Sequence, residues 1–576
     1  MKRIFCVLLV LAAFGAVGSA RAKNKPNPFG VTVVRFAKGT PRSQMTAAVM
    51  RAGGSVVTDL SEIGALAVSP GGSEFVAKVG SDPRVTAVFV EPVLRAPIDA
   101  DFRAGAGPLW TPAFGPSTSP DPWHDATSFL GVTNPQGTLQ WDDARMNVAA
   151  AWTKTRGDRA IRVAVIDTGV QGSHRELNAN FVGSTSFIPC DTLTHDFGAA
   201  VVRAFGLRDC SSEDKEGHGT WVASRIAGAL NGFASNGVAP NVQVAGYKVL
   251  AAGFGGMPDW ILSGLVSACD DGVDLVNMSI VGYFDATDAS EAQTYLLFND
   301  AVQYCRDRGV AVFASAGNEH VRIDRETTTV GGRTLIGVGR VSGGADGIAT
   351  TRPGTETLAG SDLRGQLEAP GGVPGVVFVS ATNNGNDAAP ADDAFARGMH
   401  VGARDQLAYY SNYGSRIDVA APGGARRFNL PGWDGGDRNF LYGGWGSLGA
   451  LDASAEICTD PTESSLFNFA CFKVAGNGFG WLQGTSMASP NAVGVAALAL
   501  SAKRELRKNP AGLTARLLAT ARAATNFTGP LDPANRAAAY DGRPCSTGYC
   551  HLDTSQPIAF ADAYGAGVVD AGAAVN

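Results

Sequence analysis

The chain has 576 residues, which is too long for one ordinary folding core, since single domains commonly run to about 150 residues. The 53 acidic residues nearly balance the 47 basic residues, and a net charge of −6 provides no basic face of the kind that nucleic acid binding requires. Hydrophobic residues make up 45% of the chain and charged residues 17%, so enough apolar surface is available for a core, which argues against general disorder.

Residues 1–22 have the pattern of a cleaved signal peptide. Lys2 and Arg3 precede an apolar stretch at 4–17, and the small residues Ala20 and Ala22 follow, as they do before a cleavage site. A membrane anchor is the alternative, but the stretch is shorter than the roughly 20 residues that a span needs, and no later segment reaches that length. We predict a secreted protein, extracellular or periplasmic, with no membrane span after signal removal.

Residues 30–95 are expected to form a small α+β domain of the ferredoxin-like kind. Short apolar strands and two amphipathic helices alternate in the order β-α-β-β-α-β. The strands are expected at 31–36, 55–68 (two strands) and 85–90, and the helices around 45–52 and 75–79. Residues 96–139 are rich in Pro, Gly, Ala and Asp, a composition typical of a linker or processing region.

From residue 140 to 576 the pattern predicts an α/β domain. Apolar β-branched strands alternate with amphipathic helices, which is typical of a parallel sheet with helices on both faces. The strands are expected at 161–166, 242–250, 274–280 and 310–315, and the helices at 218–230, 258–269 and 291–308. Two Gly-rich stretches, 319–375 and 424–482, interrupt the alternation and are interpreted as long loop insertions.

The cysteines favour disulfide bonds. Of nine cysteines, Cys6 lies in the predicted leader, and an even number remains, which is typical of exported chains. Four near-neighbour pairs are our hypothesis: Cys190 with Cys210, Cys269 with Cys305, Cys458 with Cys471, and Cys545 with Cys550. None has the Cys-x-x-Cys spacing of zinc sites. For Cys269 and Cys305, buried free thiols remain an alternative, because each lies near a helix end before an apolar strand.

Three polar residues at the ends of predicted elements are candidate catalytic residues. Asp167 follows the strand at 161–166, His218 opens a helix within Gly217-His218-Gly219-Thr220, and Ser486 precedes the helical run at 492–500. Each alone has an ordinary interpretation: a turn residue, a surface histidine and an N-cap serine. Together they supply a nucleophile, a base for its proton and a carboxylate to orient that base.

The order of these residues along the chain separates two classes of hydrolase. Gly484-x-Ser486-x-Ala488 is similar to the nucleophile elbow of α/β-hydrolases, in which Ser precedes Asp and then His. Here the order is Asp, His, Ser, which is the order of subtilisin. A lipase or esterase is therefore disfavoured.

The motifs around these residues resemble those of the subtilisin-like serine proteases, the subtilases. Asp167-Thr168-Gly169, His218-Gly219-Thr220 and Gly484-Thr485-Ser486-Met487-Ala488-Ser489-Pro490 are similar to the three signatures of the family, and the resemblance covers most of 140–576. It implies a serine endopeptidase with Asp167, His218 and Ser486 as the triad and Asn318 in the oxyanion hole. It also implies a zymogen, in which residues 30–95 form an inhibitory propeptide, and protein or peptide substrates.

The resemblance also implies a substrate-binding strand formed by Ser279, Ile280, Val281 and Gly282. Its free edge pairs with an extended peptide through main-chain hydrogen bonds. Val281 stands where the family usually has Gly, unless a bulge lets Gly282 take that place, and its bulk is expected to narrow the primary pocket. Asn491 stands where the family usually has His, a packing difference without evident consequence for catalysis.

A bound metal has weak support from the sequence. Glu176, in His174-Arg175-Glu176-Leu177, falls where the family often has an Asp ligand for calcium, but a lone exposed Glu is the ordinary alternative. Catalysis itself is expected to need no cofactor, while structural calcium stays open.

These inferences predict activity at neutral to alkaline pH, lost below about pH 6.5, because the histidine must be neutral to act as a base. The competing function is a catalytically silent peptide-binding protein of the same fold.

Overall fold

The structure is a computed structural model. It describes residues 31–69, 72–92, 140–197, 211–251, 255–349, 362–383, 405, 407–408, 410–424, 446–452, 454–455, 471–474, 476–524, 539–540, 552–553 and 558–576. The predicted signal peptide at 1–22 and the predicted processing region at 96–139 lie outside these residues. In the described part of the chain, no helix is long and apolar enough to cross a membrane.

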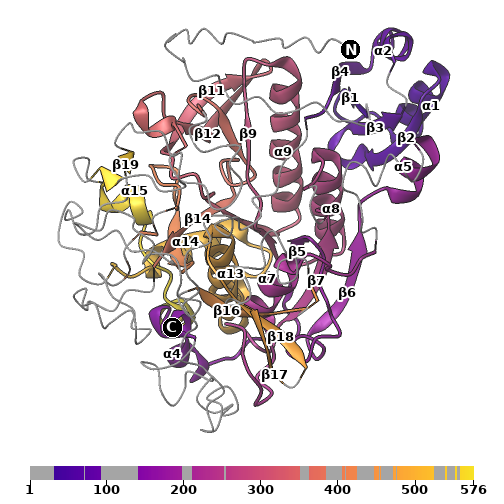
Figure 1. The fold of residues 1–576 in the computed structure, drawn as a ribbon. Coiled ribbons are helices and arrows are strands. Elements are labelled where there is room, and N and C mark those ends of the chain that lie inside the picture. Colours follow the sequence, from indigo (N-terminus) through magenta and orange to yellow (C-terminus); the bar gives the residue numbers. More distant parts are fainter. Residues whose placement is uncertain are drawn as a thin grey trace, which may run out of the picture.

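The N-terminal part forms a four-stranded antiparallel sheet with two helices on one face, as predicted (Figure 1). Its elements are β1 (Thr32–Phe36), α1 (Arg42–Ala52), β2 (Ser55–Leu60), β3 (Ala65–Ser69), α2 (Ser73–Gly80) and β4 (Val85–Val90). The strand order is β2-β3-β1-β4. Met45 and Val49 of α1 pack with Phe75 and Val79 of α2 against Val34, so this face has an apolar core of its own.

A seven-stranded parallel sheet is the centre of the larger domain, and the predicted α/β class is confirmed. Its strands lie in the order β15-β14-β10-β8-β5-β7-β6. They are β5 (Arg162–Asp167), β6 (Phe181–Ser186), β7 (Gln243–Lys248), β8 (Leu275–Met278), β10 (Ala311–Ser315), β14 (Val377–Thr382) and β15 (Val419–Pro422).

Helices cover both faces of this sheet, and each face has a separate apolar core. In β5, Val163 and Val165 belong to the core beneath α7 (His218–Ala227) and α13 (Thr485–Ala502), whereas Ala164 and Ile166 belong to the core beneath α8 (Pro258–Asp270) and α9 (Ala289–Asp307). Alternate residues of a strand point to opposite faces, so an unbroken apolar run is what a sheet buried on both sides requires.

The two stretches that we expected to be loops contain strands, and that expectation is wrong. Residues 319–375 include β11 (Ile323–Val330), β12 (Arg333–Val341) and β13 (Leu367–Ala369), which form a sheet with β9 (Gly282–Phe284); residues 424–482 include β16 (Ser447–Leu451), β17 (Cys471–Val474) and β18 (Asn477–Leu482). At least one of these glycines lies in a strand because of close packing: a Cβ on Gly449 of β16 would lie 2.6 Å from the Trp221 indole.

Shorter elements complete the described chain. They are α3 (Trp141–Arg145), α4 (Val148–Trp152), α5 (Cys190–Phe197), α14 (Pro510–Thr520), α15 (Phe560–Tyr564), α16 (Ala571–Val575), β19 (Ala539–Tyr540), β20 (Leu552–Asp553) and three 3-10 turns at Ser61–Ile63, Ala345–Gly347 and Arg504–Leu506.

The predicted disulfide between Cys269 and Cys305 is present and joins α8 to α9, so the free-thiol alternative is wrong for this pair. Cys190 is also disulfide-bonded. Its expected partner, Cys210, lies outside the described residues, as do Cys458, Cys545 and Cys550, so the other three pairs stay predictions.

The N-terminal sheet packs its second face on α8 and α9. Val33, Ala67 and Phe89 share one apolar core with Trp260. At the edge of this contact the Thr58 hydroxyl donates to Asp259 Oδ2 at 2.6 Å.

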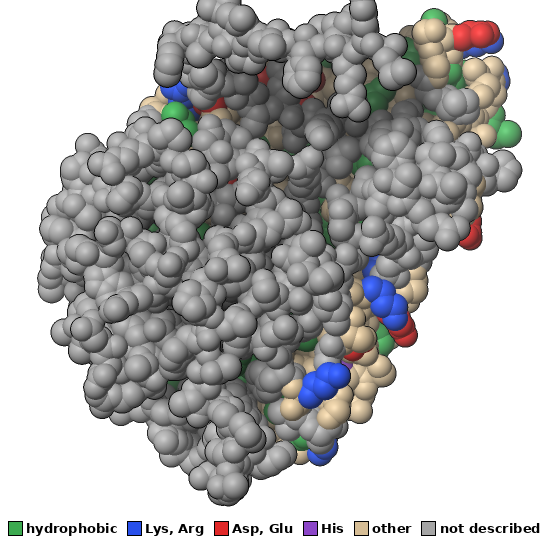
Figure 2. Space-filling view, in the orientation of Figure 1, with side chains coloured by type: hydrophobic (Ala, Val, Ile, Leu, Met, Phe, Trp, Pro, Cys, Tyr) green, Lys and Arg blue, Asp and Glu red, His purple; other side chains and the backbone are tan. Residues whose placement is uncertain are grey.

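Along the right-hand edge of Figure 2, described Lys and Arg side chains lie near Asp and Glu side chains. The described residues at that edge therefore form no patch of a single charge sign.

Candidate active site

The predicted site residues come from elements that meet at one edge of the parallel sheet. β5 and β8 are hydrogen-bonded neighbours, with Ile166 opposite Met278, so Asp167 at the end of β5 lies beside the exit of β8. Helices α7 and α13 pack against each other, and they begin at or next to His218 and Ser486. Sites in open α/β sheets form at this carboxyl edge.

Asp167 and His218 form a buried pair. His218 Nδ1 lies 2.8 Å from Asp167 Oδ1, and both side chains are almost inaccessible to solvent. Asp167 Oδ1 also accepts from the backbone N–H of Thr168 at 2.7 Å. With the proton on Nδ1, the imidazole donates to the carboxylate, which leaves Nε2 as the nitrogen that can accept a proton.

A carboxylate that sequence reasoning missed builds the loop before His218. Asp214 accepts hydrogen bonds from the backbone N–H groups of Glu216, Gly217 and Thr220 and from the hydroxyls of Thr168 and Thr220. It therefore fastens the first turn of α7 to the residue that follows Asp167. The sequence could have indicated an acidic partner for this loop, because three acidic residues lie within the five positions before His218.

A second missed carboxylate, Glu216, is buried beside the histidine. Its Oε2 accepts from the His218 backbone N–H at 2.7 Å. Burial raises the pKa of this carboxyl; the charge of His218 opposes the rise, and the charge of Asp214 adds to it.

Close approach of backbones explains a glycine of the His218 motif. A Cβ on Gly219 would lie 2.1 Å from the carbonyl oxygen of Gly169, so no larger residue fits between α7 and the turn after β5. The Gly219 N–H donates to the Thr168 hydroxyl at 2.9 Å.

Ser486 is held at the first turn of α13 by the end of β8. Its carbonyl accepts from the Ser279 hydroxyl at 2.8 Å, and its own hydroxyl lies 3.5 Å from the Ser279 carbonyl, at the limit of a hydrogen bond. Asn277 in turn donates to the Ser279 hydroxyl and accepts from Ser489. The nucleophile candidate is thus anchored to the strand next to Asp167.

Asn318 lies against the same helix start. Its Oδ1 accepts from both the backbone N–H and the hydroxyl of Thr485, each at 2.9 Å. Because Thr485 holds the amide oxygen of Asn318, the NH₂ group of the same amide points away from Thr485. A fixed amide donor next to a backbone N–H at a helix start can stabilise an oxyanion.

The predicted substrate-binding strand has side chains that face the interior. Ile280 lies in the core beneath α8, and Val281 lies in a second apolar cluster with Tyr283 and Ala316. Gly282 opens β9 and is paired with Ala369 of β13. The side chains of Ile280 and Val281 are therefore unavailable for contact with a ligand.

Two buried carboxylates lie behind this strand. The Tyr283 hydroxyl donates to Glu319 Oε2 at 2.5 Å, and Asn412 donates to the same oxygen at 3.0 Å. Burial, together with the charge of Glu319, raises the pKa of Tyr283. Burial also raises the pKa of Glu368, which accepts from the N–H groups of Gly371 and Gly372.

Glu176 is not the exposed residue that we considered as the ordinary alternative. Its side chain is fully buried, and Oε1 accepts from the Ser235 backbone N–H at 3.0 Å. Burial raises the pKa of its carboxyl to about 8. The neighbouring groups are N–H donors, which repel a cation, and the described residues contain no cluster of three or more metal-ligating side chains. The residues around Glu176 therefore do not fit a calcium site.

Comparison with protein families gives one broad match. The family described as "Subtilase family" matches residues 158–567. Among individual proteins, the chain is similar to subtilisin NAT of Bacillus subtilis subsp. natto, with 26% identity over 341 residues; the match covers 59% of this chain and 55% of that protein. It is 32% identical to an intracellular serine protease of Paenibacillus polymyxa over 176 residues, which cover 31% of this chain and 47% of that protein.

Two solved structures share the fold. The epidermin leader peptide processing serine protease of Staphylococcus aureus superposes with a TM-score of 0.58 and 18% identity, covering 95% of this chain and 97% of that one. Fervidolysin from Fervidobacterium pennivorans, a keratinolytic enzyme related to subtilisin, superposes with a TM-score of 0.54 and 18% identity, covering 97% and 62%.

Proposed function

Because this chain belongs to the subtilase family, we propose that it is a serine endopeptidase that hydrolyses peptide bonds in protein or peptide substrates. One observation carries the proposal: the buried 2.8 Å contact between His218 Nδ1 and Asp167 Oδ1, at the sheet edge where α13 begins with Thr485 and Ser486. A buried imidazole oriented by a carboxylate is the base that activates a hydroxyl nucleophile, and we propose Ser486 as that nucleophile.

Each residue has one role in the proposed reaction. The Ser486 oxygen attacks the carbonyl carbon of the substrate, and His218 Nε2 takes the hydroxyl proton and returns it to the leaving amine, which leaves an acyl-enzyme. A water molecule, deprotonated by the same nitrogen, then attacks the acyl carbon, and the proton returns to Ser486 as the acid product leaves. Asp167 holds the imidazole and stabilises its charged form. The amide NH₂ of Asn318 and the backbone N–H of Ser486 stabilise the oxyanion.

The substrate backbone is proposed to pair with the segment of Ser279, Ile280, Val281 and Gly282 as an added strand. The buried Ile280 and Val281 side chains support recognition through the main chain. The proposed reaction uses the chain's own side chains and no cofactor. Calcium bound elsewhere than at Glu176 stays a prediction, tested by thermal unfolding with calcium and with a chelator.

We also propose that the chain is made as a zymogen, with residues 30–95 as the intramolecular inhibitor. The docking of the N-terminal sheet on α8 and α9 supports this, since Arg35 contacts Gln293 at 3.0 Å and forms an ion pair with Asp300 at 2.5 Å. Gln140 exchanges two hydrogen bonds with Asn236 of the large domain. The activating cleavage is therefore expected before residue 140, within 96–139.

Export is the proposed destination. The signal pattern at 1–22 supports it, and the disulfide between Cys269 and Cys305 fits an oxidising extracellular or periplasmic environment. Neither nucleic acid nor a membrane span is expected to take part.

The decisive experiment compares the wild type with Ser486→Ala by intact mass, N-terminal sequencing and casein hydrolysis. We expect the wild type to lose a segment ending within 96–139 and to digest casein, and the variant to do neither. Activity should fall below about pH 6.5, where His218 becomes protonated and cannot act as a base. A pH optimum near 4, or equal casein hydrolysis by Ser486→Ala, would contradict the proposal. A wild type that binds peptides but cleaves nothing would support the silent binding protein.

A further inference from the structure

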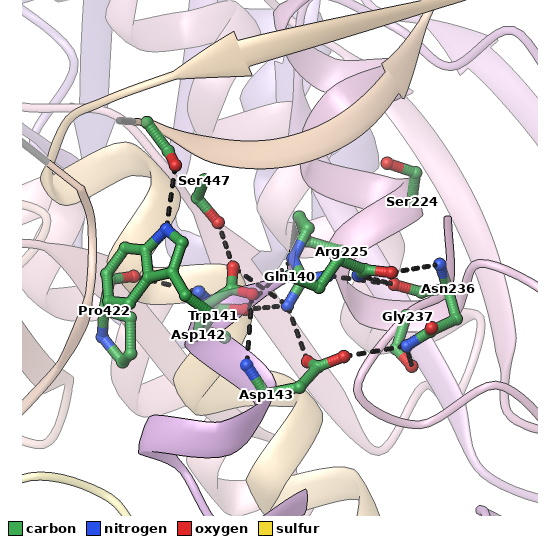
Figure 3. A network of polar contacts seen from close by, with 12 residues as sticks. Gln140, Trp141, Asp142, Asp143, Ser224, Arg225, Asn236, Gly237, Pro422 and Ser447 are labelled. Carbon is green, nitrogen blue, oxygen red and sulfur yellow. Dashed lines mark hydrogen bonds and ion pairs between the residues drawn. The ribbon is translucent and has the colours of Figure 1, made fainter. Parts of the chain in front are cut away.

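Arg225 is the centre of a buried polar network that the proposed reaction does not use (Figure 3). Its side chain is completely inaccessible to solvent. The guanidinium contacts four residues from three segments of the chain: Asp142 at 3.1 Å, Asp143 at 2.9 Å, the Asn236 carbonyl at 2.9 Å and the Asn491 Oδ1 at 3.0 Å. A planar guanidinium with partners on several sides fixes their relative positions more firmly than a point charge does.

One of these contacts, between Arg225 and Asn491, connects the helices that carry the proposed base and nucleophile. Arg225 lies seven residues after His218 on α7, about two helical turns, so the two side chains project from the same face. Asn491 lies on α13, which begins next to Ser486. The contact between Arg225 and Asn491 therefore sets how α7 sits against α13.

The Asn491 amide is fixed at both ends. Its Oδ1 accepts from Arg225 Nε at 3.3 Å as well as from the terminal nitrogen, and its Nδ2 donates to the Pro422 carbonyl, at the end of β15, at 2.9 Å. An amide can accept from a guanidinium and donate to a carbonyl at the same time. Asn491, which we expected to be a packing difference without evident consequence for catalysis, thus has a defined partner at each end of its amide.

The counter-charges come from the N-terminal segment of the large domain. Asp143 also accepts from the Asn236 side chain at 2.9 Å, and Asp142 accepts from the Ser447 hydroxyl. The Trp141 indole N–H donates to the Gly446 carbonyl at 2.9 Å. These contacts hold residues 140–143 against α7, Asn236 and the start of β16. Without them Arg225 would be a buried charge lacking its carboxylates, which is strongly destabilising.

We infer that Arg225, Asn491 and the carboxylates of Asp142 and Asp143 are positioning residues for the His218–Ser486 pair. The inference rests on the proposed function, because positioning matters only if these two side chains react. None of the four touches the reacting atoms. They hold α7, α13 and residues 140–143 in one arrangement, and small displacements of reacting groups cost large factors in rate. Activation that removed residues 140–143 would therefore yield a poorly active enzyme.

The test measures kcat and KM on a peptide substrate, together with the rate at which a fluorophosphonate labels Ser486, well below the unfolding midpoint. For Asn491→Ala we expect kcat and the labelling rate to fall about tenfold or more, with KM changed by less than about twofold. Asp143→Asn should lower both rates in the same way. Asn491→Asp keeps the acceptor for Arg225 but replaces the donor to the Pro422 carbonyl with an oxygen, so it should lower both rates as well.

Asp274→Asn is the matched control. Asp274 is buried and paired with Arg507 at 3.2 Å, but it precedes β8 at the opposite end of that strand. This variant should lower the unfolding midpoint and keep kcat. The inference is overturned if Asn491→Ala or Asp143→Asn behaves like the control, with a lower unfolding midpoint and an unchanged kcat. If Asn491→Ala does not fold, Arg225→Lys takes its place in the test. This variant keeps the charge and loses the planar guanidinium, so it should lower kcat and the labelling rate with little change in KM. A wild type inactive on casein would refute the proposed function instead.

Discussion

Replacing Glu176 with Gln should stabilise the protein at alkaline pH and leave its stability unchanged at acidic pH. Burial raises the pKa of the Glu176 carboxyl from 4.5 to about 8, against a smaller opposing contribution from the hydrogen bond to the Ser235 backbone N–H. Gln has nearly the same shape, and its oxygen can keep that hydrogen bond. The substitution therefore removes the titration and little else.

The magnitude follows from proton linkage. The folded carboxyl titrates at about 8 and the unfolded one at 4.5, so the folded state binds the proton more tightly and loses stability as the pH rises between these values. Each pH unit in this interval costs about 1.4 kcal/mol. The upper bound is about 3 kcal/mol at pH 7 and about 5 kcal/mol well above pH 8, and any water that reaches the ionised carboxylate lowers both figures.

Urea unfolding at pH 4, 7 and 9 measures the effect, with Ser486→Ala as the background so that self-cleavage does not interfere. The free energy of unfolding of Glu176→Gln should equal that of the parent at pH 4 and exceed it progressively at pH 7 and 9. Glu505→Gln removes an exposed carboxyl and serves as the control with no such trend. Destabilisation by Glu176→Gln at every pH, abolished by a chelator, would show that Glu176 is ionised and binds a cation, and it would refute the reasoning.

Three further predictions concern the site and the helices behind it. Asn318→Ala should lower kcat by about 100- to 1,000-fold with little change in KM, measured on a peptide substrate; an effect on KM alone would exclude an oxyanion role. Gly219→Ala places a methyl group 2.1 Å from the Gly169 carbonyl, so it should abolish casein hydrolysis, and unchanged activity would mean that the two backbones separate freely. Cys305→Ser removes the bond to Cys269 and should lower the free energy of unfolding, measured in urea, by about 2 to 4 kcal/mol; Cys269→Ser should give the same loss, and an unchanged free energy would contradict the prediction.

The parts of the fold that the sequence predicts are those whose signal is local. The unbroken apolar run of β5 is sufficient to predict a strand buried on both faces, and α9 begins with Asp288 as its N-cap, a local start signal. The strand β16 was missed because its glycine is dictated by a tertiary contact, that of Gly449 with Trp221. Composition alone cannot separate a Gly-rich loop from a Gly-rich strand packed on an aromatic ring.

In the candidate site, too, the sequence predicts some features and not others. The positions of Asp167, His218 and Ser486 at element ends are visible in the motifs, because a tight turn or a helix start needs particular neighbours. The burial of Glu176 and the partners of Asn491 are not visible. Arg225 meets Asn491 across 266 positions and Asp143 across 82, and no local pattern indicates which polar residue a buried guanidinium will find.

Long-range partners of this kind explain why a motif predicts a role better than it predicts a geometry. The proposed roles need only a carboxylate, an imidazole and a hydroxyl in the expected order along the chain. The alignment of these three groups depends on residues that take no part in the proposed reaction. Asp214 fixes the start of α7 to Thr168, and Arg225 fixes the far end of that helix to α13. A helix held at both ends cannot rotate His218 away from Asp167 without breaking buried charged contacts, and such contacts are costly to leave unpaired. The rate of the proposed reaction should therefore respond to both anchors, although neither touches the substrate.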